Sequence, residues 1–95
     1  MTIDRPLSTD DARGAIAAAL LRIVPDADPA GLPDEAPIRA ELELDSLDFL
    51  SFVELLSGAT GVRIDEADYP QLVSMSSGIA FLTRRGGYDD VQTTT

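Results

Sequence analysis

Apolar residues recur along this chain at helical spacing and predict three main helices. The first helix is expected over residues 9–24, the second over residues 46–57, and the third begins after residue 74. Within each segment the apolar positions fall three or four residues apart, so they share one face of a helix. These positions are Ala12, Ile16, Leu20 and Ile23, then Phe49, Phe52, Val53 and Leu56, then Met75, Ile79 and Leu82 or Phe81.

Cap and breaker residues set the expected ends of these helices. Ser8 followed by Asp11 forms a capping box in its aspartate variant and starts the first helix, which Pro25 ends. Gly58 is expected to end the second helix, and Gly86 or Gly87 the third.

Two connections differ in character. Prolines at positions 25, 29, 33 and 37 leave no room for a helix or a central strand, so residues 25–45 are predicted to be a long loop. Ile38 and Leu42 are its expected anchors in the core. In the second connection, Asp65 can cap a short helical turn over residues 66–69, before Pro70.

No segment alternates between apolar and polar residues with a period of two, so sheet content is predicted to be near zero. Three main helices and one short helix can bury their apolar faces only against one another. The predicted fold class is all-α, a small four-helix bundle. We expect the bundle to span residues 8–85, with a flexible lead-in over residues 1–7 and a flexible tail over residues 86–95.

Charge and composition restrict the function. The 95 residues include 17 acidic and 7 basic side chains, for a net charge of −10. Such a chain repels nucleic acid and anionic membranes and favours partners with basic patches. Histidine and cysteine are absent, which removes the commonest general base, the commonest metal ligand and any thiolate. No signal peptide is apparent and the longest apolar run is too short to cross a bilayer, so we expect a cytoplasmic monomer.

Ser46 stands out because it lies at a predicted helix start, between Asp45 and Asp48. By itself, a serine at this position is typical of an N-cap. Covalent modification is compatible with that role, since free backbone N–H groups and the helix dipole favour an anion at a helix start. Leu47 and Leu50 lie off the core-facing stripe of the same helix and could form a small contact patch.

The segment around Ser46 resembles the phosphopantetheine carrier domains, the acyl and peptidyl carrier proteins. Their motif is a leucine, a glycine, a variable residue and then Asp-Ser-Leu at the start of the second helix. The matching residues are Leu42, Asp45, Ser46, Leu47 and Asp48, and the downstream stretch GVRIDEADYPQL resembles the family's loop and short third helix. The resemblance covers roughly residues 8–84 and includes the long loop between the first two helices.

This resemblance implies a carrier protein rather than an enzyme. A 4′-phosphopantetheine arm derived from coenzyme A would be attached to Ser46 and would carry acyl groups as thioesters. The expected partners are a phosphopantetheinyl transferase and acyl-activating, ketosynthase or acyltransferase enzymes with basic docking patches. Docking would use residues of the second helix and its start: Asp45, Leu47, Asp48, Leu50 and Glu54. No metal site is expected.

Several residues depart from the family pattern and point to a specialised carrier. Glu43 replaces the motif's glycine, which predicts a backbone that does not need positive φ there. Glu54 replaces a common apolar contact residue. With Met1 at the start and a short polar tail, these features favour a free-standing carrier in a dedicated lipid, polyketide or other secondary-metabolite pathway over a primary fatty-acid carrier.

Two alternatives remain open from the sequence. A peptidyl or aminoacyl carrier would share the same chemistry and differ only in its cargo. An unmodified helical interaction module would use the same bundle and the Leu47 and Leu50 patch, with Ser46 serving only as a cap.

Overall fold

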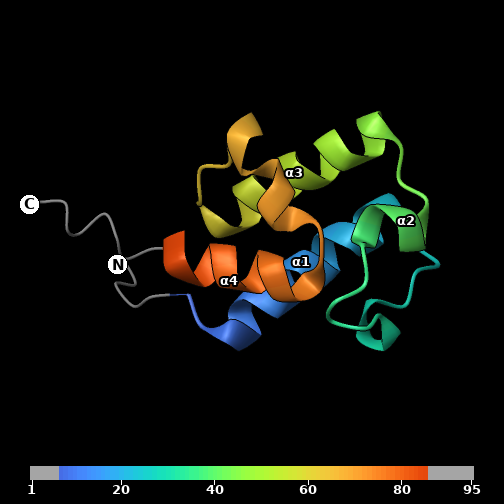
Figure 1. The fold of residues 1–95 in the computed structure, drawn as a ribbon, viewed down its shortest axis with the longest axis horizontal. Helices are drawn as coiled ribbons and strands as arrows, with labels where there is room; N and C mark the ends of the chain where they lie inside the picture. Colours follow the sequence, from blue (N-terminus) through green and yellow to red (C-terminus); the bar gives the residue numbers. More distant parts are fainter. Residues whose placement is uncertain (1–6, 86–95) are drawn as a thin grey trace, which may run out of the picture.

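The computed structural model describes residues 7–85, in which helices are joined by loops and turns (Figure 1). The elements in order are α1 (Thr9–Ile23), the 3-10 helix η1 (Pro29–Gly31), α2 (Ile38–Leu42), α3 (Ser46–Thr60), the 3-10 helix η2 (Glu66–Leu72) and α4 (Met75–Arg85). Within residues 7–85, β pairing is limited to one isolated bridge between Pro37 and Ser74. The predicted all-α bundle is confirmed.

The expected lead-in and tail fall, apart from Leu7, outside the described residues, and their predicted flexibility stays a prediction. Between Leu7 and Arg85, none of the helices combines the length and the hydropathy that a bilayer-spanning segment needs.

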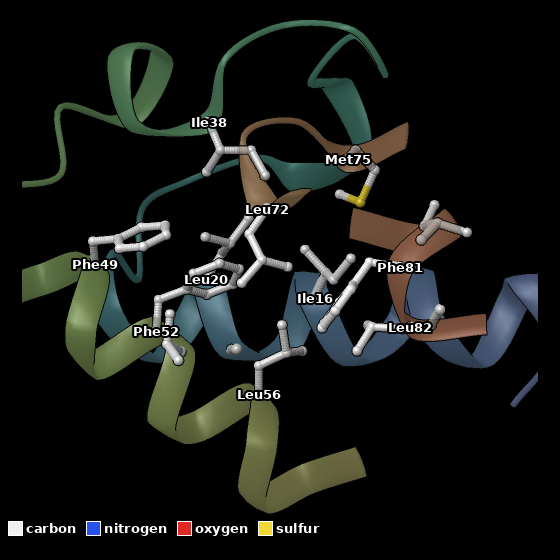
Figure 2. Packing of buried hydrophobic residues seen from close by; sticks show 14 of the residues in the cluster. Ile16, Leu20, Ile38, Phe49, Phe52, Leu56, Leu72, Met75, Phe81 and Leu82 are labelled. Carbon is white, nitrogen blue, oxygen red and sulfur yellow. The ribbon is translucent and has the colours of Figure 1, made fainter. Parts of the chain in front are cut away.

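The bundle is organised around α1, which packs against both α3 and α4, while η2 packs on α4 (Figure 1). Side chains from all of these elements meet in one continuous apolar core (Figure 2). Of the predicted core-facing positions, all are buried except Ile23, which is partly buried. The core also takes up residues that the helical spacing did not identify: Ala19, Leu44 and Leu72.

The start of α1 agrees with the predicted capping box. Ser8 Oγ accepts a hydrogen bond from the Asp11 backbone N–H at 3.0 Å, and the Asp11 carboxylate accepts one from the Ser8 N–H at 3.3 Å. The helix ends at Ile23, one residue before the expected end, with Val24 as its C-cap.

The prediction that residues 25–45 hold no helix is wrong. Pro29 occupies the first turn of η1, and Pro37 is the N-cap of α2. At these positions the missing N–H of proline would have no helical acceptor, so the residue starts a helix instead of breaking it. Of the expected anchors, Ile38 is buried and Leu42 is partly buried.

The long segment is tied to the start of α4 by backbone hydrogen bonds. The Ile38 N–H donates to the Val73 carbonyl at 2.8 Å, and the Ser76 N–H donates to the Asp34 carbonyl at 2.9 Å. Asp34 is also paired with Arg13 of α1 at 3.0 Å. These contacts hold the segment that leads into α2 on the bundle.

The predicted end of α3 is also wrong, because the helix continues through Gly58 to Thr60. A glycine in a helix interior costs about 1 kcal/mol relative to alanine, which does not force termination. The end comes at Gly61, which adopts φ 75° and donates its N–H to the Ser57 carbonyl at 2.8 Å. Positive φ is readily available to glycine, so Gly61 is the effective C-cap.

The short helix η2 extends beyond the expected residues 66–69 and passes through Pro70 to Leu72. Because a residue at the first position of a 3-10 turn donates no hydrogen bond within it, Pro70 can begin a second turn. Asp65 is the N-cap of η2 as predicted: its N–H donates to the Asp68 carboxylate at 3.0 Å, and its backbone carbonyl accepts from the Asp68 N–H at 2.8 Å.

An ion pair fixes η2 to the end of α4. The Arg85 guanidinium donates to both Asp68 carboxylate oxygens, at 3.1 and 3.2 Å. The hydrogen bond from the Asp65 backbone N–H and that from Arg85 hold the pKa of the Asp68 carboxyl below its usual value. Asp68 is buried, so this charge is kept in the interior only because it is fully paired.

The expectation that Glu43 avoids positive φ is wrong. Glu43 has φ 56° and ψ 45°, in the left-handed region, and is the C-cap of α2. A side chain at such a position costs roughly 1–2 kcal/mol, which glycine would avoid. The backbone therefore keeps the glycine-type turn even though the sequence supplies glutamate.

Replacing Glu43 with glycine is expected to stabilise the fold by about 0.5–1 kcal/mol, because relief of the left-handed strain exceeds the added freedom of the unfolded chain. Urea denaturation measures the change. Glu41→Gly, two residues earlier within α2, is the matched control and should destabilise by about 1 kcal/mol. Equal losses for both variants would contradict the assignment of strain to Glu43.

Candidate functional site

The candidate site is the first turn of α3, and its geometry is set by two aspartates. Asp45 is the N-cap, and its carboxylate accepts a hydrogen bond from the Asp48 backbone N–H at 2.8 Å. In return, the Asp48 carboxylate accepts one from the Asp45 N–H at 3.4 Å. The interpretation of Ser46 as the N-cap is therefore wrong by one residue: Asp45 caps the helix and Ser46 is its first residue.

This arrangement leaves the Ser46 side chain unengaged. The residue is exposed, and among residues 7–85 no group makes a hydrogen bond with its Oγ. Within the same range, the backbone N–H groups of Ser46 and Leu47 also have no acceptor, as expected for the first two positions of a helix. The turn thus presents a free hydroxyl beside two free N–H donors.

Apolar residues on either side anchor this turn to the core. Leu44 immediately precedes the cap and Phe49 is the fourth residue of the helix, the two positions of a hydrophobic staple. They are 5% and 6% exposed, respectively, and both belong to the core cluster. Figure 2 shows Phe49 directed from α3 towards the packed side chains. Because Leu44 before Ser46 and Phe49 after it are both buried, the orientation of the turn is fixed and Ser46 faces solvent.

Other serines in the bundle are less suited to modification. Ser57 donates its hydroxyl to the Val62 carbonyl at 2.8 Å, and Ser74 and Ser77 are hydrogen-bonded to each other. Ser51 is exposed like Ser46 but lies in the middle of α3, where the backbone N–H groups are used within the helix. Only a serine in the first turn has free N–H donors beside it.

The expected docking residues lie around this turn and along α3. Leu47 is 74% exposed and Leu50 is 41% exposed, while Asp45 and Glu54 are exposed and Asp48 is partly buried. Leu47, Leu50 and Glu54 are spaced by three and four residues, so they share one side of the helix. The structure therefore places Leu47, Leu50 and Glu54 on one side of α3, while Asp45 and Asp48 lie at its start and are hydrogen-bonded to each other.

A groove near the site was not identified from the sequence. It has a volume of about 280 Å³ and is lined by Pro37, Arg39, Phe49, Tyr69, Pro70 and Val73. The Tyr69 ring packs edge-on against Phe49, with centroids 5.3 Å apart. The walls of the groove come from three segments that are distant in the sequence: residues 37–39, Phe49 of α3, and residues 69–73. No local sequence pattern predicts that these segments meet.

The site offers a nucleophile without machinery to activate it. The carboxylates of both neighbouring aspartates are used in the capping box. Over residues 7–85, no group of His, Cys, Asp or Glu side chains could coordinate a metal ion.

Removal of the Asp45 cap should lower the free energy of unfolding, whereas removal of the Ser46 hydroxyl should leave it nearly unchanged. Asp45→Ala is expected to destabilise the fold by about 1 kcal/mol because it leaves the Asp48 N–H unsatisfied. Ser46→Ala is expected to change stability by less than about 0.5 kcal/mol, as for other exposed positions. Urea denaturation of both variants measures these changes. A larger loss of stability for Ser46→Ala than for Asp45→Ala would indicate that Ser46, and not Asp45, caps the helix.

Comparison with known families agrees with this geometry. A family model described as the phosphopantetheine attachment site matches residues 14–77, more than half of the chain. No curated protein matches the sequence. The matched range runs from α1 to the start of α4 and contains the whole of α3. The chain belongs to the phosphopantetheine attachment family, the carrier domains that bear a covalently attached 4′-phosphopantetheine group.

Proposed function

We propose that the chain is an acyl carrier and that Ser46 is the residue to which the arm is attached. The observation that carries the proposal is the unengaged, exposed hydroxyl of Ser46 in the first turn of α3, within the matched range. Because Asp45 provides the cap, the serine oxygen is available without loss of a structural hydrogen bond. We take residues 8–85 as the carrier unit.

The proposed loading reaction is a phosphoryl transfer from coenzyme A. Ser46 Oγ attacks the β-phosphorus of the pyrophosphate and forms a phosphodiester bond. The bond from that phosphorus to the bridging oxygen breaks, and adenosine 3′,5′-bisphosphate leaves with the electron pair. The hydroxyl proton passes to a base of the transferase, which also supplies Mg²⁺ to neutralise the pyrophosphate.

The residues present fit this group. The free N–H donors of Ser46 and Leu47 and the helix dipole favour a phosphate at the start of α3. When bound, the arm supplies a terminal thiol that carries acyl groups as thioesters, so a chain without cysteine can serve thiol chemistry. By bond geometry the extended arm reaches roughly 15–20 Å, so the cargo can enter a partner's active site while the bundle stays outside.

The surface around Ser46 suits brief docking to basic partners. Asp45, Asp48 and Glu54 supply negative charge, and Leu47 and Leu50 supply a small apolar contact. An exposed ion pair contributes at most about 1 kcal/mol, which allows rapid release between successive enzymes. We therefore propose these five residues as the docking surface for the transferase and for acyl-activating, ketosynthase or acyltransferase enzymes.

The pathway is part of the same proposal. We assign the carrier to a dedicated lipid, polyketide or other secondary-metabolite pathway, since Glu43 and Glu54 depart from the family pattern. Intact-protein mass spectrometry of the carrier from its native host would identify the cargo. If the arm carries an aminoacyl group, the protein is a peptidyl or aminoacyl carrier. If the protein carries no arm at all, the alternative of an unmodified helical interaction module is favoured. A cytoplasmic location stays a prediction from the sequence.

Loading with coenzyme A tests the attachment residue. Incubation of the unmodified protein with coenzyme A and a broad-specificity phosphopantetheinyl transferase should add about 340 Da, the mass of the phosphopantetheinyl group. The gain should be lost in Ser46→Ala and retained in Ser51→Ala, because Ser51 is exposed on the same helix but lies outside its first turn. No gain in the wild type, or a gain that survives Ser46→Ala, would overturn the proposal.

The docking surface is tested by the rate of the same reaction. Leu47→Ala is expected to lower kcat/KM for loading about fivefold, the effect of losing roughly 1 kcal/mol of contact energy at an interface. Leu21→Ala is the matched control, since Leu21 is 39% exposed but lies on α1. Equal rates for the two variants, with unchanged melting temperatures, would remove Leu47 from the docking surface.

A further inference from the structure

The arginines of the bundle differ in how far they are already paired. Four of them make side-chain contacts with acidic or amide groups: Arg13 with Asp34, Arg63 with Asp65, Arg85 with Asp68, and Arg84 with Gln71. Within residues 7–85, Arg22 and Arg39 have no carboxylate in salt-bridge range. Arg22 lies in the last turn of α1, where a positive charge suits the helix dipole, whereas Arg39 makes side-chain contacts beside the start of α3.

Arg39 lies against the turn that presents Ser46. Its Nε donates to the Leu44 carbonyl at 3.4 Å, two residues before the serine. Its guanidinium carbon lies 5.2 Å from the centroid of the Phe49 ring, three residues after the serine. The guanidinium is thus held between residues that flank Ser46 on both sides, and among the described residues its two terminal nitrogens have no hydrogen-bond acceptor.

An anion bound to Ser46 would need such a cation. The two nearest carboxylates, of Asp45 and Asp48, repel a phosphate attached to the same turn. The free N–H groups of Ser46 and Leu47 offset part of this repulsion. A guanidinium is the side chain best suited to the remainder, because two parallel N–H donors can contact two phosphate oxygens together.

We propose that Arg39 is a positioning residue that pairs with the phosphodiester on Ser46 and directs the arm along the adjacent groove. The inference rests on the proposed attachment at Ser46. Arg39 lines one edge of the groove, and the other walls are apolar or aromatic: Pro37, Phe49, Tyr69, Pro70 and Val73.

The chemistry of the arm matches the lining of the groove. Beside the methylene group that bears its phosphate, 4′-phosphopantetheine has a carbon with two methyl groups, so an apolar segment directly follows the anion. A groove that combines a guanidinium with apolar and aromatic walls is complementary to these groups. The occupant of the groove at rest is therefore the arm of the same molecule.

The test compares unmodified and loaded protein by NMR. On loading, the Nε–H resonance of Arg39 should shift more than that of Arg63, whose side chain is 86% exposed and paired with Asp65. In loaded Arg39→Gln, the ³¹P resonance should move and narrow relative to the wild type, because the phosphodiester is released. Loaded Arg63→Gln should retain the wild-type ³¹P signal, and Arg39→Lys, which keeps the charge, should fall between the two.

Each result has a separate meaning. Loading confirmed by mass, together with an unshifted Arg39 resonance and an unchanged ³¹P signal in Arg39→Gln, overturns this inference and leaves the proposed function intact. Absence of any mass gain overturns both. If Arg39→Gln does not fold, which circular dichroism of the unmodified variant reveals, the wild-type Arg39 resonance and Arg39→Lys still decide.

Discussion

The organisation of the site depends on one reciprocal pair of hydrogen bonds, those between Asp45 and Asp48 at the start of α3. They satisfy the cap of the helix with groups other than the serine hydroxyl. If Ser46 were the cap, modification of its oxygen would remove a bond that the helix needs. Because Asp45 takes that role, a large group can be attached to Ser46 without a structural cost to the bundle.

The same turn combines two buried residues, which attach it to the core, with two exposed residues between them. Leu44 and Phe49 are buried and tie the turn to the core. Ser46 and Leu47, between them, face solvent. In the proposed function, Ser46 is the position offered to a series of enzymes, and the two buried anchors would keep its orientation constant. The acidic character of the surrounding surface then favours partners with basic sites.

The sequence predicted the main helices and their buried faces because helical spacing is a local property, and nearly all of the stripe residues are in the core. It also placed Ser46 at the start of a helix. Errors arose where a single residue can act in more than one way. Proline breaks a helix interior, yet Pro37 starts α2; glycine often ends a helix, yet Gly58 lies within α3.

Other features depend on tertiary contacts that no local pattern contains. Asp45 and Ser46 are both good caps, so only the three-dimensional turn decides between them. Leu44 lies in a connection, and its burial follows from the packing of the helices on either side. The groove combines Arg39 with residues of α3 and η2. The left-handed turn at Glu43 was missed because glutamate seldom adopts that conformation, and there the geometry of the chain prevails over the preference of the residue.

The hydrogen bonds between the proline-rich segment and the start of α4 have a consequence for the shape of this groove. Two bonds form this connection: the Ile38 N–H donates to the Val73 carbonyl, and the Ser76 N–H donates to the Asp34 carbonyl. They join the segment that contains Pro37 and Arg39 to the segment that contains Pro70 and Val73. Two parts of the groove lining that are distant in the sequence are thereby joined by backbone hydrogen bonds. Phe49 of α3 supplies a third part of the lining. The relative position of these two segments is therefore fixed by backbone hydrogen bonds and does not depend on side-chain packing alone.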